Sequence, residues 1–226
     1  MNEKAVVILS GGLDSSGVAA YWKNENHDLY LLTFNYGQRA SQEIVRAKEI
    51  AEYLGAKDHK LLDISFMKSL YGSSNVLTDA TKEMPSSFQS NIIVPIRNAV
   101  FLTIATAYAF SIQAKVVAYG AHLTDQPYPD CRPEFAMELS SALNLGDIDA
   151  IKSGSHPEVK IWSPAIASLT KYEMLKVSYA ILGDQVARTW SCYLNAEKQC
   201  GRCESCNNRK SAFKKAGIPD LTDYTV

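Results

Sequence analysis

A short segment rich in glycine and serine, near the start of the chain, has the residue types needed to hold phosphate groups. Its residues are Leu9, Ser10, Gly11, Gly12, Leu13, Asp14, Ser15 and Ser16. Adjacent glycines let backbone N–H groups approach a ligand, and serine hydroxyls donate to phosphate oxygens. Helix formers follow from Ser15, so a helix N-terminus would add a positive dipole end. We predict that residues 9–16 bind ATP; the alternative is a plain strand-to-helix turn capped by Asp14.

Asp14 adds a carboxylate to this segment. A carboxylate repels phosphate unless a divalent cation lies between them, so Asp14 indicates that Mg²⁺ is bound together with ATP. The segment matches neither GxxxxGK[ST] nor GxGxxG. It resembles the PP-loop of the ATP pyrophosphatase superfamily, and this resemblance implies that ATP is cleaved between its α and β phosphates.

Four cysteines lie close together near the end of the sequence: Cys192, Cys200, Cys203 and Cys206. Four thiolates are the number that tetrahedral zinc requires in a closed structural site, and we predict such a site here. An iron–sulfur cluster is the second reading, but the nearby Cys-Pro of that pattern is replaced by Asn207-Asn208. Disulfides rank lower, because we recognise no secretion signal. Cys131 is isolated, and we expect it to pack in a loop.

Composition restricts the classes of function. The 226 residues have a formal net charge of −1, which argues against a protein whose main task is to grip a nucleic-acid backbone. The apolar run at residues 5–9 is too short for a signal sequence, and no stretch approaches twenty apolar residues. We therefore expect a soluble, cytoplasmic protein without a membrane segment or a direct nucleic-acid partner.

Buried-strand patterns alternate with helical patterns along most of the chain. Strands are predicted at 6–9, 29–34, 59–64, 115–119 and 159–162. Helices are predicted at 15–23, 41–54, 98–113 and 170–182, with another that ends near Leu143. Ser41 and Gly55 are the expected cap residues of the second helix. The less regular residues 65–93 are predicted to form a loop that covers an active site.

This alternation indicates an α/β fold with a doubly wound, mostly parallel sheet, Rossmann-like and of the adenine-nucleotide alpha-hydrolase type. We predict two units: an ATP-binding domain at 1–187 and a small C-terminal zinc-binding segment at 188–226. Ligands of such sheets bind beyond the carboxyl ends of the strands, so the site is expected at the loops after Leu9, Phe34 and Tyr119.

Several further strings occur between the phosphate loop and the cysteines. They are Tyr36-Gly37-Gln38 with Glu43, Pro95-x-Arg97-Asn98, Tyr119-Gly120, Asp125 with Tyr128-Pro129-Asp130-Cys131-Arg132 and Phe135, Lys171, and Ser191-Cys192-Tyr193. With these strings the chain resembles the 7-cyano-7-deazaguanine synthase family along nearly its whole length. The resemblance implies a homodimeric, ATP-dependent ligase that converts 7-carboxy-7-deazaguanine and ammonia, through adenylates, into the nitrile precursor of queuosine or archaeosine.

Residue roles follow from the resemblance and from side-chain chemistry. We predict catalytic roles for Asp14, Arg97 and Lys171, in which Arg97 holds a phosphate or the substrate carboxylate. The substrate base is assigned to a second set: Tyr128, Asp130, Arg132 and Phe135. The plainer alternatives are a surface salt bridge for Arg97, a rigid loop around Asp130 and a solvated Lys171.

Two rival functions remain open from the sequence. One keeps the PP-loop chemistry and changes the substrate, as in a tRNA-modifying thiolase or a lysidine synthase. The other is a non-enzymatic zinc-ribbon protein that binds nucleic acid. The net charge and the phosphate loop disfavour the second, and no tRNA-binding extension is recognised for the first.

Overall fold

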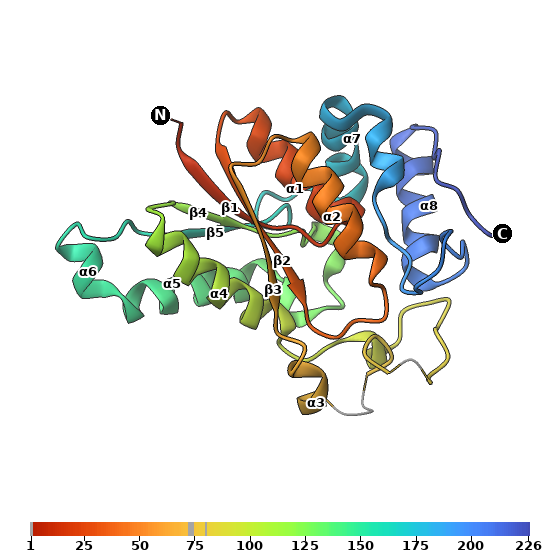
Figure 1. Ribbon diagram of the computed structural model, residues 1–226, viewed down its shortest axis with the longest axis horizontal. Coiled ribbons are helices and arrows are strands. Elements are labelled where there is room, and N and C mark those ends of the chain that lie inside the picture. Colours follow the sequence, from red (N-terminus) through yellow and green to blue (C-terminus); the bar gives the residue numbers. More distant parts are fainter. Residues whose placement is uncertain (1, 72–74, 80) are drawn as a thin grey trace.

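The computed structural model describes residues 2–71, 75–79 and 81–226. Its centre is a parallel sheet with the strand order β3-β2-β1-β4-β5 (Figure 1). The strands are β1 (Lys4–Ile8), β2 (Asp28–Asn35), β3 (Asp58–Asp63), β4 (Val116–Ala118) and β5 (Lys160–Trp162). The predicted parallel α/β sheet is therefore confirmed.

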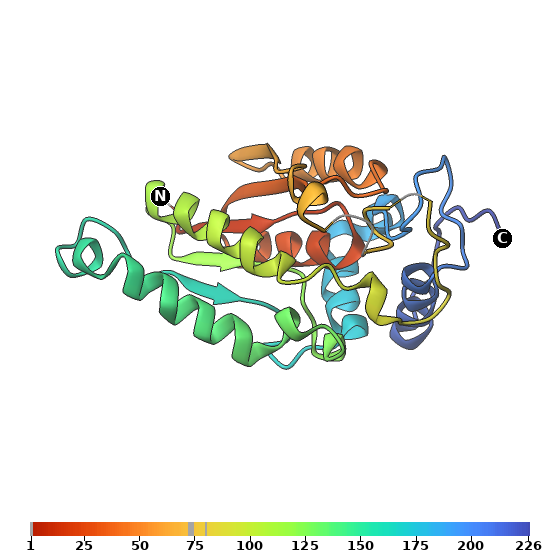
Figure 2. The ribbon, with the colours of Figure 1, turned by 90° about the horizontal axis from the view of Figure 1, so that it is seen from below.

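Helices cover both faces of the sheet (Figures 1 and 2). One face packs against α1 (Leu13–Asn24), α2 (Gln42–Tyr53) and α7 (Lys171–Leu182), and the other against α4 (Arg97–Ser111) and α5 (Pro133–Gly146). Successive side chains of β1 alternate between the two: Ala5 and Val7 face the first group, and Val6 and Ile8 face the second. A strand covered on both faces needs apolar residues at every position, which explains the unbroken apolar run.

The order of the strands reverses between β1 and β4. The chain leaves β1 through α1 and pairs β2 on one side, and later it adds β4 on the other side. The two loops that follow these strands therefore diverge from adjacent carboxyl ends, which is where open α/β sheets bind ligands. A Cβ on Gly120, after β4, would lie 2.9 Å from the backbone nitrogen of Ser15, so the two loops are in direct contact.

The predicted strands and long helices are present, with bounds shifted by one to three residues. Three helices were not predicted: α3 (Met67–Tyr71), α6 (Ile148–Lys152) and α8 (Glu204–Ala216). α3 and a turn at Ser90–Ile92 lie in the segment 65–93, of which residues 72–74 and 80 lie outside the described residues. α8 has several charged and amide side chains between its buried positions, so its sequence lacks a broad apolar stripe.

The ends of α2 show one correct prediction and one wrong one. Gly55, after the C-terminus, adopts φ +62°, the left-handed conformation expected of a glycine there. Ser41 precedes the helix, but its hydroxyl donates to Asn195 Oδ1 at 2.9 Å and makes no cap bond. The hydroxyl is therefore used to join α2 to the C-terminal segment.

The expectation about apolar stretches also needs correction. Within the described residues, the helical stretch Ser90–Ser111 is long and apolar enough to cross a membrane by length and composition alone. In this fold its main part, α4, packs on the sheet, where Leu102, Ala105 and Ala109 are fully buried. A helix that is buried against a sheet can be as long and as apolar as a helix that crosses a membrane.

Candidate active site

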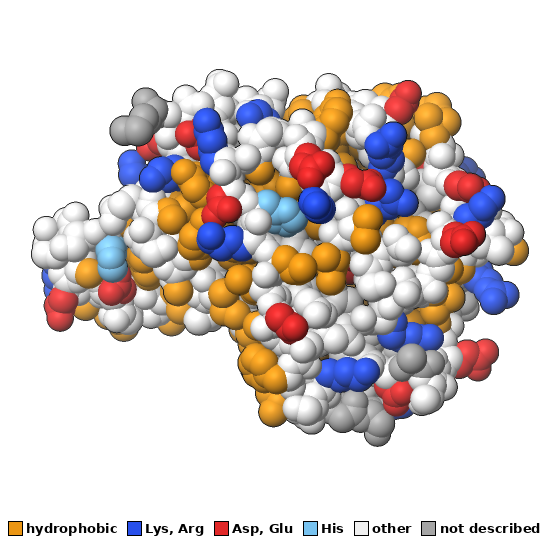
Figure 3. All heavy atoms as spheres, viewed as in Figure 1, with side chains coloured by type: hydrophobic (Ala, Val, Ile, Leu, Met, Phe, Trp, Pro, Cys, Tyr) orange, Lys and Arg blue, Asp and Glu red, His pale blue; other side chains and the backbone are white. Residues whose placement is uncertain are grey.

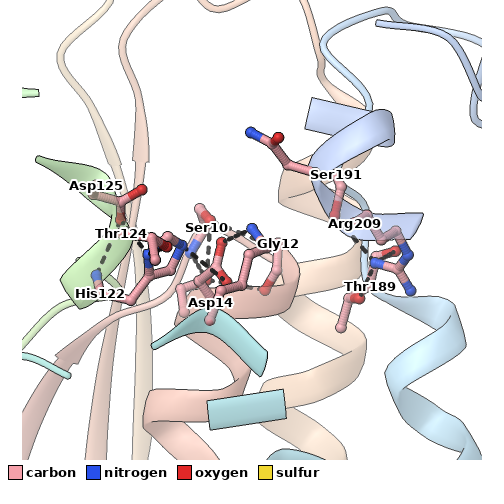
Figure 4. A network of polar contacts seen from close by, with 12 residues as sticks. Ser10, Gly12, Asp14, His122, Thr124, Asp125, Thr189, Ser191 and Arg209 are labelled. Atoms are coloured by element: carbon pink, nitrogen blue, oxygen red, sulfur yellow. Dashed lines mark hydrogen bonds and ion pairs between the residues drawn. The ribbon is translucent and has the colours of Figure 1, made fainter. Parts of the chain in front are cut away.

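A cavity of about 280 Å³ opens at the carboxyl ends of β1, β2 and β4. The phosphate loop forms one wall, the loops after β2 and β4 and the start of α4 form others, and the C-terminal segment closes it. Leu77, Ile92 and Ile93 also line it, so the described part of segment 65–93 borders the site as predicted. Figure 4 shows the polar groups on both sides of the phosphate loop.

Contacts among its own residues fix the conformation of the phosphate loop. The hydroxyls of Ser10 and Ser15 lie 2.9 Å apart, and the Ser10 hydroxyl accepts from the backbone N–H of Gly12 at 3.3 Å. Gly11 has φ +84°, and a Cβ there would lie 2.1 Å from the backbone oxygen of Glu43 in α2. Only glycine fits this position, because both the backbone conformation and the space exclude a side chain.

The predicted ATP-binding residues occupy different places around this loop. Those that line the cavity are Ser10, Gly12, Leu13, Asp14 and Ser15. Leu9 is buried in the core, and Gly11 packs against α2. Ser16 is fully buried in α1, and its hydroxyl has no partner among the described residues. Leu9, Gly11 and Ser16 are therefore not among the residues that line the cavity.

Asp14 and Lys171 form an ion pair at the mouth of the loop. Lys171 Nζ donates to Asp14 Oδ2 at 2.7 Å, although the two residues are far apart in sequence. Lys171 is the first residue of α7, which begins with a capping box between Thr170 and Glu173. Burial alone would raise the pKa of Asp14, but the charge of Lys171 and its hydrogen bond to the carboxylate hold the pKa below its usual value. Asp14 is therefore an anion that faces the cavity.

His122 and Asp125 extend this cluster from the loop after β4. His122 Nε2 lies 3.8 Å from Asp14 Oδ1, and its Nδ1 lies 3.2 Å from Asp125 Oδ2 (Figure 4). Burial lowers the pKa of His122 to about 4, so the imidazole is neutral. Burial and the charge of Asp14 raise the pKa of Asp125 to about 7. No site role was assigned to His122 or Asp125 from the sequence. The available signal was their position shortly after β4, one of the two strands between which the strand order reverses.

Arg97 lies at the opposite side of the cavity, at the start of α4. Its Nη1 donates to the Tyr36 hydroxyl at 3.0 Å, and its guanidinium lies over the Tyr36 and Phe101 rings. Its Nε is buried without a hydrogen-bond partner among the described residues. The preceding Ile96 has φ +47°, an unusual conformation for a β-branched residue and one associated with functional sites. This geometry suits an anion-binding role for Arg97 better than a surface salt bridge.

Asp130 caps the same helix from another segment. Its Oδ2 accepts from the backbone N–H of Asn98 at 2.9 Å, and its Oδ1 accepts from the Asn98 side chain at 3.2 Å. These bonds satisfy part of the N-terminus of α4 and fix Arg97 beside it. Asp130 therefore makes a rigid loop at the start of α4, which was the plainer alternative to a substrate-binding role. It also lines the cavity.

The other three predicted substrate residues are not gathered together. Tyr128 lines the cavity and packs edge-on against Phe88, with ring centroids 5.4 Å apart. Arg132 is exposed, and its Nε donates to the backbone oxygen of Gln126 at 3.0 Å. Phe135 is half-buried in α5 and is not among the residues that line the cavity.

The four cysteines form a compact group. Their sulfur atoms all lie within 4.8 Å of one another, and all four residues are buried. The backbone N–H groups of Leu194 and Cys200 donate to Cys192 Sγ at 3.4 and 3.3 Å, and that of Cys203 donates to Cys200 Sγ at 3.3 Å. Four sulfurs with N–H donors around them fit a tetrahedral metal ion.

The C-terminal segment is part of the cavity wall. Its lining residues are Trp190, Ser191, Tyr193, Glu204, Ser205 and Asn208. Trp190 N donates to the backbone oxygen of Gly11 at 2.9 Å, so the segment contacts the phosphate loop directly. Both predicted units, 1–187 and 188–226, thus contribute to one cavity.

Arg209 fixes this contact from α8. It is fully buried, and its guanidinium donates to Thr189 Oγ1 at 2.7 Å, Ser191 Oγ at 3.1 Å and the backbone oxygen of Val186 at 2.7 Å (Figure 4). We expect Arg209→Met to lower the free energy of unfolding by about 3–5 kcal/mol, since it leaves these acceptors unpaired in the interior. Urea denaturation measures this; Arg202→Met, at an exposed position of the same segment, is the control. An equal loss in both variants would contradict the assignment.

Lys171 gives a second prediction. We expect Lys171→Met to lower the kcat/KM for ATP by about 10²- to 10³-fold, because the variant removes the cation that lies next to Asp14 at the phosphate loop. Lys176→Met, on the exposed side of the same helix, is the matched control. Steady-state release of pyrophosphate at varied ATP concentration measures the effect, and a Lys171 variant with the control's kinetics would be inconsistent with the site.

Fold and site together define the class: a PP-loop protein built on an α/β nucleotide-binding fold. A family model described as "Queuosine biosynthesis protein QueC" matches residues 4–217, and the chain belongs to this family. Curated proteins called 7-cyano-7-deazaguanine synthase are similar over nearly their full length. That of Caldicellulosiruptor saccharolyticus is 38% identical over 99% of this chain and 96% of its own, and that of Legionella pneumophila (strain Philadelphia 1) is 41% identical over 98% and 97%.

Another relative of the same name comes from Thermoplasma acidophilum, with 39% identity over 98% of this chain and 92% of its own. Among solved structures, an NH3-dependent NAD synthetase from Campylobacter jejuni has 15% identity and a TM-score of 0.40, and the match covers 79% of this chain and 87% of that one. Family membership confirms the resemblance identified in the sequence.

Proposed function

We propose that this protein is an ATP-dependent ligase that converts 7-carboxy-7-deazaguanine and ammonia into 7-cyano-7-deazaguanine, with AMP and pyrophosphate as by-products. The observation that supports it most is the full-length similarity to proteins of that name. A cavity also joins the phosphate loop to an arginine nitrogen that has no hydrogen-bond partner among the described residues. The nitrile would serve queuosine or archaeosine synthesis.

The first step of the reaction is activation of the carboxylate. A carboxylate resists ammonia because its leaving group would be oxide, whereas an acyl adenylate releases AMP. The N–H groups and hydroxyls of residues 10–15 would bind the pyrophosphate as it forms, and Lys171 would neutralise its charge. Arg97 would hold the acyl oxygens at the other side of the cavity, so that the reacting atoms lie between these two groups.

A nitrile requires a second activation. Ammonia first gives an amide, and the amide oxygen must then be removed. Adenylation of that oxygen in the same cavity lets it leave on AMP, so we propose two ATP for each nitrile. The base would stay in place near Tyr128 and Asp130 while its exocyclic group changes.

Two metals belong to the proposal. Zn²⁺ fits the four cysteines because a closed set of four sulfurs is its usual structural site. Mg²⁺ fits Asp14, whose carboxylate is ionised and faces the cavity. Mg²⁺ bound with ATP supplies charge neutralisation on the phosphates, and the cysteine site stabilises the segment that contacts Gly11.

The proposal also covers the oligomeric state, the compartment and nucleic-acid binding. We propose a cytoplasmic homodimer without a direct nucleic-acid partner. Acidic and basic side chains are interspersed on the face shown in Figure 3, in line with the net charge of −1. Apolar side chains are exposed around α2 and β3, among them Val45, Tyr53 and Leu61, and they offer a surface for a second copy. Light scattering of the purified protein tests the dimer.

Mass spectrometry of one incubation tests the activity. The purified protein is mixed with 7-carboxy-7-deazaguanine, ammonium and ATP, and nitrile, amide and AMP are counted. We expect nitrile and two AMP per nitrile. One AMP per nitrile would exclude the second adenylation, and ADP in place of AMP would exclude the proposed function altogether.

A further inference from the structure

Five carboxyl groups line the cavity: Asp14, Glu43, Asp125, Asp130 and Glu204. Four of them have hydrogen-bond partners. The partners are Lys171 for Asp14, the backbone N–H of His122 for Asp125, Asn98 for Asp130, and Tyr193 with Asn208 for Glu204. Among the described residues, no hydrogen bond is formed by the carboxyl of Glu43. A carboxyl that faces a cavity without a partner is available to a ligand or to a proton.

Glu43 lines the same cavity as the two groups that would hold the acyl adenylate. It belongs to the first turn of α2, and its backbone oxygen packs against Gly11 of the phosphate loop. Its side chain lines the cavity and interacts electrostatically with Arg97, whose Nε is buried without a hydrogen-bond partner in the part of the chain that the structure describes. The Glu43 carboxyl therefore shares one cavity with both groups that would hold the acyl adenylate, and it interacts with Arg97.

We propose that Glu43 is the base that takes the proton from ammonia when ammonia attacks the acyl adenylate. This inference rests on the proposed function and assigns one step of it. As the C–N bond forms, a proton passes from the nitrogen to a Glu43 carboxylate oxygen. The C–O bond to AMP then breaks, its electron pair leaves on AMP, and the amide remains.

The surroundings of Glu43 suit this proton transfer. Burial raises the pKa of Glu43 to about 8, and the charge of Arg97 opposes the rise. The other titratable group that interacts with it is Tyr36, whose own pKa is raised by burial. A base with a pKa near the working pH is both present as carboxylate and able to bind a proton. Since the carboxylate is the active form, the amidation rate should rise with pH through about 8.

The test separates adenylation from amidation in the variant Glu43→Gln. Adenylation is measured as exchange of labelled pyrophosphate into ATP, with 7-carboxy-7-deazaguanine and without ammonium. Amidation is measured as amide plus nitrile from pH 6 to 9, with total ammonium adjusted so that free ammonia, whose fraction rises with pH, stays saturating at every pH. We expect the variant to retain exchange, to lose about 10²- to 10⁴-fold in amidation, and to lose the rise with pH. Glu43→Asp should recover part of the rate.

Glu52→Gln, at an exposed position of the same helix, is the control and should behave as the unaltered protein. Equal loss of exchange and amidation in Glu43→Gln would overturn the proposal in favour of a structural role. Unchanged amidation would overturn it outright. Absence of exchange in the unaltered protein would instead refute the proposed function, so the two failures are distinguishable.

Discussion

Replacement of Gly11 by alanine is expected to abolish most of the pyrophosphate exchange while the chain still folds. The added Cβ would lie 2.1 Å from the backbone oxygen of Glu43 and 2.6 Å from the backbone nitrogen of Ala47, and neither atom can rotate away. The φ of +84° adds a cost of about 1–3 kcal/mol for a residue other than glycine. The loop must therefore move away from α2, and a displacement of about 1 Å at a reacting group costs about 10²-fold in rate.

The matched control is Gly146→Ala, because nothing lies within 4 Å of a Cβ at that position and its φ is not in the left-handed region. Exchange and thermal unfolding are measured for both variants. Gly11→Ala should lose exchange out of proportion to its loss of stability. Normal exchange in Gly11→Ala would show that ATP phosphates bind away from this loop.

Loss of the metal is expected to have the second large effect. The four sulfurs organise residues 192–206. Trp190, whose backbone N–H donates to the backbone oxygen of Gly11, lies just before this segment, and α8, which supplies further cavity residues, begins within it. Without the metal these residues lose a fixed position, so Cys200→Ser should lower the free energy of unfolding by about 4 kcal/mol or more. It should also lower pyrophosphate exchange by about 10²-fold, because one wall of the cavity is displaced.

Metal content, urea denaturation and exchange are measured on the same preparations. Cys131→Ser is the control for metal content and stability, because Cys131 lies outside the cluster. The unaltered protein treated with a chelator should reproduce the Cys200 variant. Full exchange in metal-free protein would mean that the C-terminal segment holds its place without the metal.

Local patterns in the sequence were sufficient to predict the sheet and to recognise the phosphate loop and the cluster of four cysteines. The unbroken apolar run of the first strand predicted a strand covered on both faces, and shorter apolar patterns alternating with helical ones predicted the other four strands. The glycines and serines of residues 10–15 indicated a loop after the first strand, and the spacing of four cysteines indicated a cluster that could hold a metal ion, because both depend on neighbours in sequence. Helix α8 was missed because it is held by Arg209 and the cysteines and has little apolar periodicity.

The tertiary structure alone decided which distant side chains meet. Lys171 lies 157 positions from Asp14 and yet forms an ion pair with it, because α7 packs beside α1 on the same face of the sheet. Glu43 becomes an unpartnered carboxyl in a cavity only when α2 is placed against Gly11, and α8 becomes a wall only when Trp190 reaches the loop. Sequence spacing determines chemistry within one turn or loop, whereas burial, charge pairing and raised pKa values depend on how separate elements pack.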